Sequence, residues 1–339
     1  MHSLLSGGLM LKVAIVGAGL MGRHHLKTAQ RLGATVVGVV DHDLRAATDL
    51  TRGLPGAHAA ESLDWLIANG SFDVAHVCTP ASSHGEIGLV LAKARIAAFV
   101  EKPLAETADE TRAIVEAFSS SGALLCPVHQ HAFQPAVDKA LRIIKKIGPI
   151  KNLSFDIVSA GGIDSNDLDR TVAEILPHPL AILQRLRPAI KLEKLSWSVS
   201  RSEPGEWVVM AVHDDLHIII SISLASRPTT FMTRLRGAHG SIEINNFHGY
   251  AVFIPGTVSR AAKIRQPFLL AGKHLATASG NLLVRAATLE SAYPGLRTLT
   301  RKFYGAVLSG DRHAAPISDS DIIGLAIARD TIMASDRVR

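Results

Sequence analysis

Short apolar runs alternate with segments of helical periodicity over residues 1–130. The runs predicted to form strands are Val13 to Val16, Thr35 to Val40, Phe72 to Cys78, Ile96 to Val100 and Ala123 to Val128. Apolar runs of this kind with helices between them are typical of a parallel sheet whose strands are joined by right-handed crossovers. The pattern therefore predicts an α/β Rossmann domain over residues 1–130.

Two signals mark the helix before the last of these strands. Thr107 and Glu110 begin and end a Thr-Ala-Asp-Glu segment, a capping box in which each side chain satisfies a backbone donor of the other residue. Gly122 predicts the end of the helix, because glycine readily adopts the left-handed conformation that follows a helix C-terminus.

The pattern changes after Pro135. Helices are predicted over Ala136 to Ile147, ended by Gly148-Pro149, and later over Leu296 to Leu308 and Asp319 to Ala334. Between them, strand-like segments separated by polar turns predict antiparallel hairpins. These segments are Leu153 to Ser159, Leu195 to Ser200, Trp207 to Val212, Leu216 to Leu224, Thr229 to Leu235 and Ser241 to Ile244. Residues 131–339 are thus expected to form an α+β domain with a large, mostly antiparallel open sheet, and its last helices could pack back on the first domain.

The first predicted strand runs directly into a Gly-x-Gly-x-x-Gly motif. Gly17 permits a tight turn, Gly19 lets the backbone approach a pyrophosphate, and Gly22 lets the following helix pack on its strand. The N–H groups at the start of that helix can hold phosphates. A dinucleotide site is therefore expected, with cofactor contacts from Gly17, Ala18, Gly19, Leu20, Met21 and Gly22.

Asp41 closes the next apolar run at about the ~20-residue offset of the ribose-binding acid in this motif. Its carboxylate is expected to accept both ribose hydroxyls and to repel a 2′-phosphate, so NAD is favoured over NADP. His42 and Arg45 follow and are expected to contact the cofactor too. The Arg45 cation could partly offset the repulsion.

Composition and charge narrow the class of protein. Of 339 residues, 47% are hydrophobic and 19% are charged, as in a folded protein with a large core. Cys78 and Cys126 are too few for a disulfide scaffold. The net charge is +6, but aromatic residues make up only 5% and no basic-aromatic module is present, which excludes nucleic-acid binding. No apolar run approaches the ~18 residues of a membrane span, so we expect a cytoplasmic protein.

Glu101-Lys102-Pro103 ends the strand predicted at Ile96 to Val100, at the carboxyl edge where open α/β sheets bind ligands. Pro103 favours an extended backbone at Lys102, so the lysine side chain could project into the crevice at that edge. A partly desolvated lysine beside a cationic nicotinamide ring would have a lowered pKa and could transfer a proton at neutral pH. A solvated lysine at a strand end is the alternative.

These motifs together resemble the glucose-fructose oxidoreductase, inositol dehydrogenase and rhizopine-catabolism (Gfo/Idh/MocA) family. The resemblance spans nearly the whole chain and is weakest between about Ala251 and Ala292. It rests on Gly17 to Gly22, Cys78-Thr79-Pro80, His84, Glu101-Lys102-Pro103, Gly237 to Glu243, and Phe303-Tyr304 to Asp321.

The resemblance implies hydride exchange between NAD(P) and a sugar, cyclitol or related substrate. It implies that Lys102 binds the reacting oxygen and that His178 acts as the acid/base. Glu174 takes the orienting role that belongs to an aspartate in the family, and this exchange is a departure from the pattern. Further cofactor contacts are implied for Cys78, Thr79, Pro80, His84, Glu101, Lys102 and Gln130.

His178 is followed by a proline, which predicts that a helix begins at Pro179 and runs toward Leu186. His178 would then face the helix N-terminus, whose dipole favours a neutral imidazole. Packing of this histidine between two prolines is the alternative.

A second departure is Ala132, where many relatives have an arginine; any electrostatic contribution from that arginine must be absent or come from elsewhere. His129 and Gln130 beside it are candidate pocket residues, with strand-end packing as the alternative. His129 and His131 are expected on one strand face without a third ligand at metal spacing, so no metal site is expected.

We therefore expect an NAD-dependent oxidoreductase acting on a carbohydrate-like hydroxyl or its ketone. An NAD-dependent glycosidase and a catalytically silent NAD(H)-binding regulator are the alternatives. A symmetric homodimer or homotetramer is expected, because a long antiparallel sheet rarely leaves a wide apolar face in water.

Basic residues between Arg260 and Lys302 stand against Glu290 alone. This excess leads to the hypothesis of an anionic substrate such as a nucleotide-diphosphate sugar, gripped by some of these cations. A solvated basic face is one alternative, and a membrane-surface role for Phe268 to Leu289 is another. The basic residues are Arg260, Lys263, Arg265, Lys273, Arg285, Arg297, Arg301 and Lys302.

Overall fold

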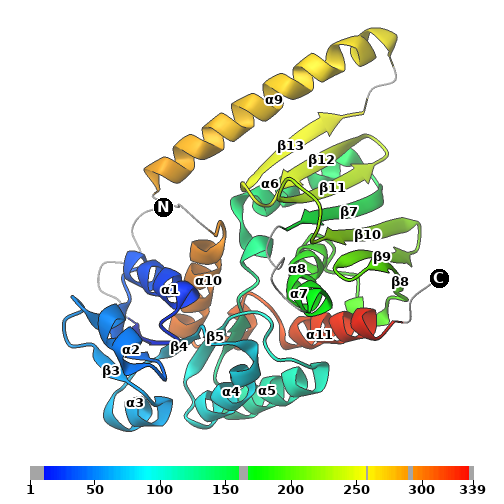
Figure 1. Ribbon diagram of the computed structural model, residues 1–339. Helices are drawn as coiled ribbons and strands as arrows, with labels where there is room; N and C mark the ends of the chain where they lie inside the picture. The colour runs from blue at the N-terminus through cyan, green and yellow to red at the C-terminus, as the bar shows by residue number, and fades with distance from the viewer. Residues whose placement is uncertain (1–10, 160–166, 257–258, 289–292, 336–339) are drawn as a thin grey trace. The chain divides into compact units, whose positions relative to one another are not determined.

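The computed structural model describes residues 11–159, 167–256, 259–288 and 293–335 (Figure 1). The chain divides into two compact units. The first comprises the residues up to His129 together with Leu296–Ala326, and the second comprises Gln130–Gly295 with the part of the chain that begins at Ile327.

The first unit is built on a parallel sheet in the order β3-β2-β1-β4-β5-β6, the order of a dinucleotide-binding Rossmann fold. Its strands are β1 (Lys12–Val16), β2 (Thr35–Val40), β3 (His58–Ala60), β4 (Val74–Val77), β5 (Ala97–Val100) and β6 (Leu125–Pro127). The helices that connect them are α1 (Leu20–Arg31), α2 (Leu44–Thr51), α3 (Leu63–Asn69), α4 (His84–Lys93) and α5 (Ala108–Ser121). The predicted Rossmann fold is confirmed.

All five predicted strands of this unit are present, each within three residues of its expected ends. β3 was not predicted, because three residues with one buried side chain leave no apolar run to detect. The capping box of α5 is confirmed: Thr107 Oγ1 accepts from the Glu110 N–H at 3.1 Å, and Glu110 Oε2 accepts from the Thr107 N–H at 3.1 Å. Gly122 adopts the left-handed conformation at φ +79° and ends the helix.

The second unit contains a seven-stranded sheet in the order β13-β12-β11-β7-β10-β9-β8. Its strands are β7 (Ile150–Val158), β8 (Ser198–Glu203), β9 (Glu206–His213), β10 (Leu216–Ser223), β11 (Thr230–Gly237), β12 (Gly240–Asn245) and β13 (Tyr250–Pro255). All neighbours are antiparallel except β7 and β10, which pair in parallel. The prediction of a large, mostly antiparallel sheet is confirmed.

The helices of the second unit are α6 (Pro135–Ile143), α7 (Leu168–Ile175), α8 (Pro177–Leu186) and α9 (Arg260–Ala287). The sequence predicted α6, but it did not predict α7, α9 or the strand β13. One sheet face is buried and the other is open: along β9, Trp207 and Val209 are buried, whereas Met210 and Val212 are exposed. The predicted helices near the C-terminal end are present as α10 (Leu296–Ser309) and α11 (Asp319–Ala334); the division between the units falls within α11.

Candidate functional site

The glycine loop of the first unit has the backbone geometry that its sequence predicts. Gly17 has φ +99°, and a Cβ on it would lie 2.8 Å from the Cys78 carbonyl carbon. A Cβ on Gly22 would lie 1.9 Å from the Gly17 oxygen, so neither position accepts a side chain. A Cβ on Gly19 would meet nothing within 4 Å, so its backbone borders open space. A pyrophosphate can approach the chain there.

Asp41 follows β2 directly and fixes the loop. Its Oδ2 accepts from the Ala18 N–H at 2.7 Å, and its Oδ1 accepts from the Asp43 N–H at 3.0 Å. His42 Nδ1 lies 3.1 Å from the same Oδ1, although the imidazole is fully exposed. The predicted ribose-binding carboxylate is thus held by backbone donors at the end of its strand.

A cavity of about 580 Å³ lies over this loop. Four of its lining residues are acidic, and one histidine is the only basic residue among them. This negative charge disfavours the binding of a 2′-phosphate. The sequence did not single out Glu61, Ser62, Asp64 or Glu86, because they follow the short strand β3 or lie on α4. The polar and loop residues that line the cavity are Gly17, Gly19, Asp41, His42, Glu61, Ser62, Asp64, Cys78, Thr79, Pro80, Ser83 and Glu86.

Other residues predicted to contact the cofactor do not line this cavity. Most of them still belong to the first unit, and Leu20 is exposed at the first position of α1. Gln130 begins the second unit. The residues outside the cavity wall are Ala18, Leu20, Met21, Gly22, Arg45, His84, Glu101, Lys102 and Gln130.

The Glu-Lys-Pro motif stands at the carboxyl end of β5, as predicted. Glu101 is buried, and its Oε2 accepts from the Lys102 backbone N–H at 3.2 Å. Burial opposes its ionisation, but the hydrogen bond from His25 and the charges of His25 and Lys102 outweigh burial and lower the pKa of Glu101. Lys102 is therefore next in the chain to an ionised carboxylate.

Behind Glu101 lies a chain of buried polar side chains that the sequence did not reveal. His25 Nε2 lies 3.0 Å from Glu101 Oε1, and His25 Nδ1 lies 3.0 Å from His76 Nδ1. His76 Nε2 lies 2.7 Å from the Tyr304 hydroxyl. The members come from α1, β4, the end of β5 and α10, all within the first unit. We call Glu101, His25, His76 and Tyr304 the buried relay.

The hydrogen positions in the buried relay follow from its chemistry. Ionised Glu101 only accepts, so His25 Nε2 carries a proton. Burial and the charge of His25 lower the pKa of His76, so His76 is neutral. Two arrangements remain. Either Tyr304 donates to His76 and His76 donates to His25, or a charged His25 donates to His76 and His76 donates to Tyr304.

The surroundings of His84 and Cys78 indicate structural rather than chemical roles in this unit. His84 is buried, with Nδ1 2.9 Å from the Pro103 oxygen and Nε2 2.9 Å from the Thr79 oxygen. The ring therefore connects the segment after β4 to the Glu-Lys-Pro turn. Burial and the negative charge of Glu101 raise the pKa of the Cys78 thiol, which makes it a poor nucleophile.

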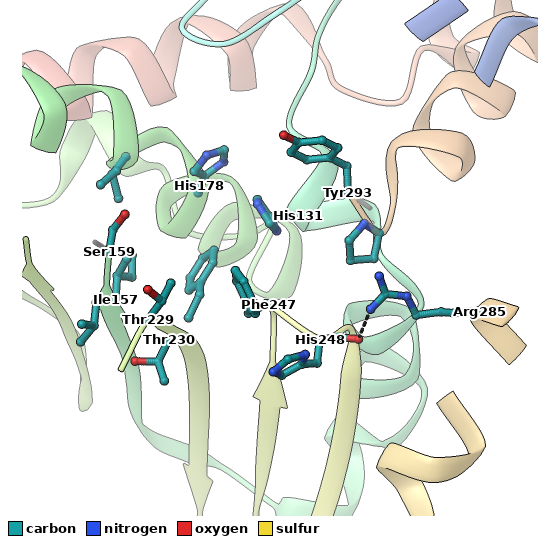
Figure 2. A pocket seen from close by; sticks show the side chains of 14 residues that line it. His131, Ile157, Ser159, His178, Thr229, Thr230, Phe247, His248, Arg285 and Tyr293 are labelled. Atoms are coloured by element: carbon teal, nitrogen blue, oxygen red, sulfur yellow. Dashed lines mark hydrogen bonds between the residues drawn. The ribbon is translucent and has the colours of Figure 1, made fainter. Parts of the chain in front are cut away.

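A second cavity, of about 500 Å³, lies in the second unit and contains His178 (Figure 2). The ring of His178 stands edge-on to that of His131, with the centroids 4.7 Å apart, and His131 stands 5.3 Å from the ring of Phe231. Arg285 reaches the cavity from α9 and donates to the His248 oxygen at 3.2 Å. The polar and aromatic lining residues are His131, Ser159, His178, Thr229, Thr230, Phe231, Phe247, His248, Arg285 and Tyr293.

Two predictions about local geometry near His178 are wrong. The helix begins at Pro177 rather than Pro179, so His178 lies inside its first turn and does not face the helix N-terminus. Leu176 also has helical dihedral angles, so α7 leads into α8 almost without interruption. Glu174 is exposed near the end of α7, four residues before His178, and does not line the cavity.

His129 and His131 do not share a strand face as expected. β6 ends at Pro127, and Gln130 to Phe133 form a 3₁₀ turn, so the two histidines belong to different local structures and fall in different units. His129 is buried, and burial lowers its pKa to about 4. Within the described residues, its Nδ1 has no hydrogen-bond partner.

A guanidinium does lie beside Ala132, the position to which the family resemblance assigns an arginine. Arg185 of α8 donates to the Ala132 oxygen and to Asp138 Oδ1, and it stacks 4.2 Å above the ring of Phe133. These contacts hold the 3₁₀ turn against α6 and α8. Arg185 is thus a structural cation that binds the backbone of this turn.

The basic segment is divided by the fold. Lys263, Arg265, Lys273 and Arg285 belong to α9 in the second unit, whereas Arg297, Arg301 and Lys302 belong to α10 in the first. Arg285 is the only one of them that lines the His178 cavity. Glu290 lies outside the described residues.

The described residues contain neither a cluster of metal-ligand side chains nor a helix suited to span a membrane. No group of three or more histidine, cysteine, aspartate or glutamate side chains there could hold a metal ion. None of the helices in the described ranges combines the length and apolar character needed to cross a bilayer.

Comparison with known proteins accounts for the first unit. Residues 11–129 match the Gfo/Idh/MocA model, described as an oxidoreductase family with an NAD-binding Rossmann fold. By this match, the first unit belongs to the Gfo/Idh/MocA family. Inositol 2-dehydrogenase of Arthrobacter sp. (strain FB24) is 37% identical over 114 residues, which are 33% of this chain and 34% of that protein. The match thus spans about a third of the curated relative.

Solved structures of similar fold extend over both units. An oxidoreductase from Agrobacterium radiobacter in complex with NAD⁺, L-tartaric acid and magnesium has a TM-score of 0.71 and 15% identity, covering 95% of each chain. UDP-N-acetylglucosamine 3-dehydrogenase from Acidithiobacillus ferrooxidans has a TM-score of 0.68 and 14% identity, covering 96% of this chain and 99% of that one. At these identities, the similarity concerns the fold alone.

Proposed function

We propose that this protein is an NAD-dependent dehydrogenase that oxidises a CH–OH group of a carbohydrate-like substrate or reduces the corresponding ketone. The observation that carries the proposal is the acid-lined cavity over the Gly17 to Gly22 loop, with Asp41 held at its wall. The loop backbone would hold the pyrophosphate, and Asp41 would accept the ribose hydroxyls. The family membership and the NAD-bound structural relative support this assignment.

The bound nicotinamide supplies the hydride acceptor or donor, and the protein manages the proton of the reacting hydroxyl. Lys102 would donate a hydrogen bond to the reacting oxygen and stabilise the charge that develops on it. His178 would accept the hydroxyl proton in the oxidative direction, and Glu174 would orient it as the family aspartate does. His131, whose ring contacts His178, is a further candidate for orienting the base.

The character of the second cavity bears on the substrate class. Its lining combines aromatic rings and hydroxyl groups with one arginine and no acid among the lining residues. Such walls suit a sugar ring, and Arg285, which donates to the His248 oxygen, is the cation in the wall that a phosphate or carboxylate would approach. We therefore propose an anionic sugar derivative, such as a nucleotide-linked sugar, as the substrate. The UDP-sugar dehydrogenase among the structural relatives supports the same class.

Reduction of NAD⁺, followed by absorbance, tests the proposal with UDP-N-acetylglucosamine, free N-acetylglucosamine and myo-inositol. We expect turnover on the nucleotide sugar that falls as salt is raised, because screening weakens the contact with Arg285. Arg285→Gln should remove the preference, whereas Lys263→Gln, at an exposed position of the same helix, should not. Release of a free sugar without net NADH would favour the glycosidase, and NADH binding without turnover would favour the regulator.

The expected homo-oligomer stays a proposal as well. The open face of the sheet carries exposed apolar side chains in alternation along β9, namely Val208, Met210 and Val212. A two-fold pairing of two such faces would bury them. Light scattering at micromolar concentration would show a dimer or a tetramer, and a monomer would contradict the proposal.

A further inference from the structure

The helix α9 presents apolar side chains to solvent along its length. It runs 28 residues beside β13 at the edge of the second unit's sheet (Figure 1). Ile264, Phe268, Leu275 and Leu282 are between 69% and 78% exposed. Large apolar side chains this exposed on one helix are unusual for a surface that faces only water.

Four of the seven large exposed apolar residues of α9 fall on a heptad pattern, whereas Leu269, Leu283 and Val284 lie outside it. Apolar residues recur at alternating spacings of four and three, which is the seam of a coiled coil. Large residues at the a positions, Phe268, Leu275 and Leu282, alternate with d positions held by Ile264, Ala271 and Ala278. Pro267 lies one residue before the first large a position and outside the seam. We call these six residues the α9 seam.

The other side of α9 binds its own unit. Lys273 Nζ lies 3.4 Å from the Phe253 oxygen, Asn281 donates to the His248 oxygen at 2.8 Å, and His274 Nε2 lies 3.6 Å from a carboxylate oxygen of Glu243. Polar and basic groups are therefore turned toward the sheet edge, and the α9 seam is turned away from it. A membrane-binding helix would instead flank its apolar stripe with several basic residues, whereas Arg265 is the one lysine or arginine beside these six positions.

The α9 seam is complementary to itself in the antiparallel direction. In an antiparallel pair an a residue packs against a d residue of the other helix, so Phe268 meets Ala278, Leu275 meets Ala271, and Leu282 meets Ile264. Two of these three layers join a large side chain to a small one, as close packing requires. A parallel pair would instead stack large on large and alanine on alanine.

Charge and area also suit a second copy. On one flank of the seam, Arg265 of one helix would stand opposite Ser279 of the other, and Gly272 opposite Gly272, so no like charges oppose each other on that flank. The exposed seam side chains offer on the order of 500 Å² per chain, so a pair would bury about 1,000 Å², the threshold of a specific interface.

We infer that α9 pairs with α9 of a second copy of this chain as a two-fold antiparallel coiled coil. This contact is separate from the open sheet face and from both cavities. Together with a two-fold contact through the sheet it would generate a tetramer with dihedral symmetry.

Oligomeric mass and cross-linking test the inference. Leu275→Asp should halve the mass measured by light scattering at micromolar concentration, while circular dichroism stays unchanged. Leu269→Asp is the matched control, because Leu269 is 62% exposed but lies outside the seam. An unchanged mass for Leu275→Asp, or an equal loss for the control, would overturn the seam.

A single cysteine tests the direction of pairing. Gly272→Cys should form a disulfide-linked dimer under mild oxidation, because position 272 lies beside the two-fold axis. Ser279→Cys should not, since it faces position 265 of the other helix. Cross-linking at 279 but not at 272 would refute the antiparallel register. Sedimentation of the wild type with phosphatidylserine vesicles, without self-association, would assign the face to a membrane and overturn the proposal.

Discussion

Tyr304→Phe tests the buried relay at its far end. The substitution removes one hydroxyl and keeps the ring, so packing changes little. It leaves His76 Nε2, now 2.7 Å from that hydroxyl, without a partner in a fully buried site. The loss holds for both proton arrangements, because Nε2 is an unsatisfied acceptor in one and an unsatisfied donor in the other.

An unsatisfied buried polar group costs about 1–3 kcal/mol of unfolding free energy, and we expect a loss of about 2 kcal/mol for Tyr304→Phe. Urea denaturation measures it. Tyr250→Phe is the control, because Tyr250 is partly exposed and water can serve its hydroxyl; its loss should stay within about 0.5 kcal/mol. Equal losses for the two variants would refute the role given to the hydroxyl.

The same relay makes a spectroscopic prediction. Nitrogen-15 NMR of labelled histidine should find a proton on His25 Nε2 at neutral pH, because Glu101 can only accept there. Tyr304→Phe should shift the nitrogen resonances of His76 and, through it, those of His25. A His25 Nε2 without a proton would show that Glu101 is not ionised, and the derivation would fail.

Three further predictions concern pH, cofactor and chemistry. His129 has a pKa of about 4 in the folded state against 6.5 in the unfolded state, so as the pH falls the unfolded state binds the proton first. About 3 kcal/mol of unfolding free energy should therefore be lost between pH 6.5 and pH 4. Urea denaturation at several pH values should show that His129→Gln makes this dependence on pH shallower. Asp41→Asn should narrow the preference for NADH over NADPH, measured by fluorescence, and tighter NADPH binding to the wild type would contradict the role of Asp41. Lys102→Met and His178→Asn should each lower turnover roughly a hundredfold or more with NADH affinity near wild type; full activity in both would refute their assignment.

The sequence predicted the parts of the fold that local patterns encode. Strands buried on both faces appear as apolar runs, and the glycine loop and the capping box depend on residues close together in the chain. The sequence did not predict β3 and β13, because these strands are short or lie at a sheet edge, where few side chains are buried. The sequence did not predict α9, because the apolar residues of this helix face away from its own unit and so do not form part of a core within the chain.

The sequence predicted the residues of the candidate site only where they lie together in one short segment of the chain. Gly17 to Gly22, Asp41 and Glu101-Lys102 form local motifs, and the structure places them at strand ends as expected. The buried relay joins His25, His76 and Tyr304 across up to 228 residues of sequence, and each of them alone resembles a core residue. No spacing rule connects residues that meet only because β4 and β5 pair while α1 and α10 pack beside them.

The error at His178 has a specific physical cause. A residue before proline usually avoids helical dihedral angles. Pro179 therefore led to the prediction that His178 lies just outside the helix. Pro177 changes the outcome, because both prolines lie in the first turn of α8, where backbone N–H groups have no partner within the helix and their loss costs nothing. The backbone of His178 therefore lies within the first turn of α8, between two residues whose own φ is fixed. His178 therefore lines its cavity from the first turn of a helix, and the acid/base role proposed for it would need the ring to keep one orientation while a proton moves.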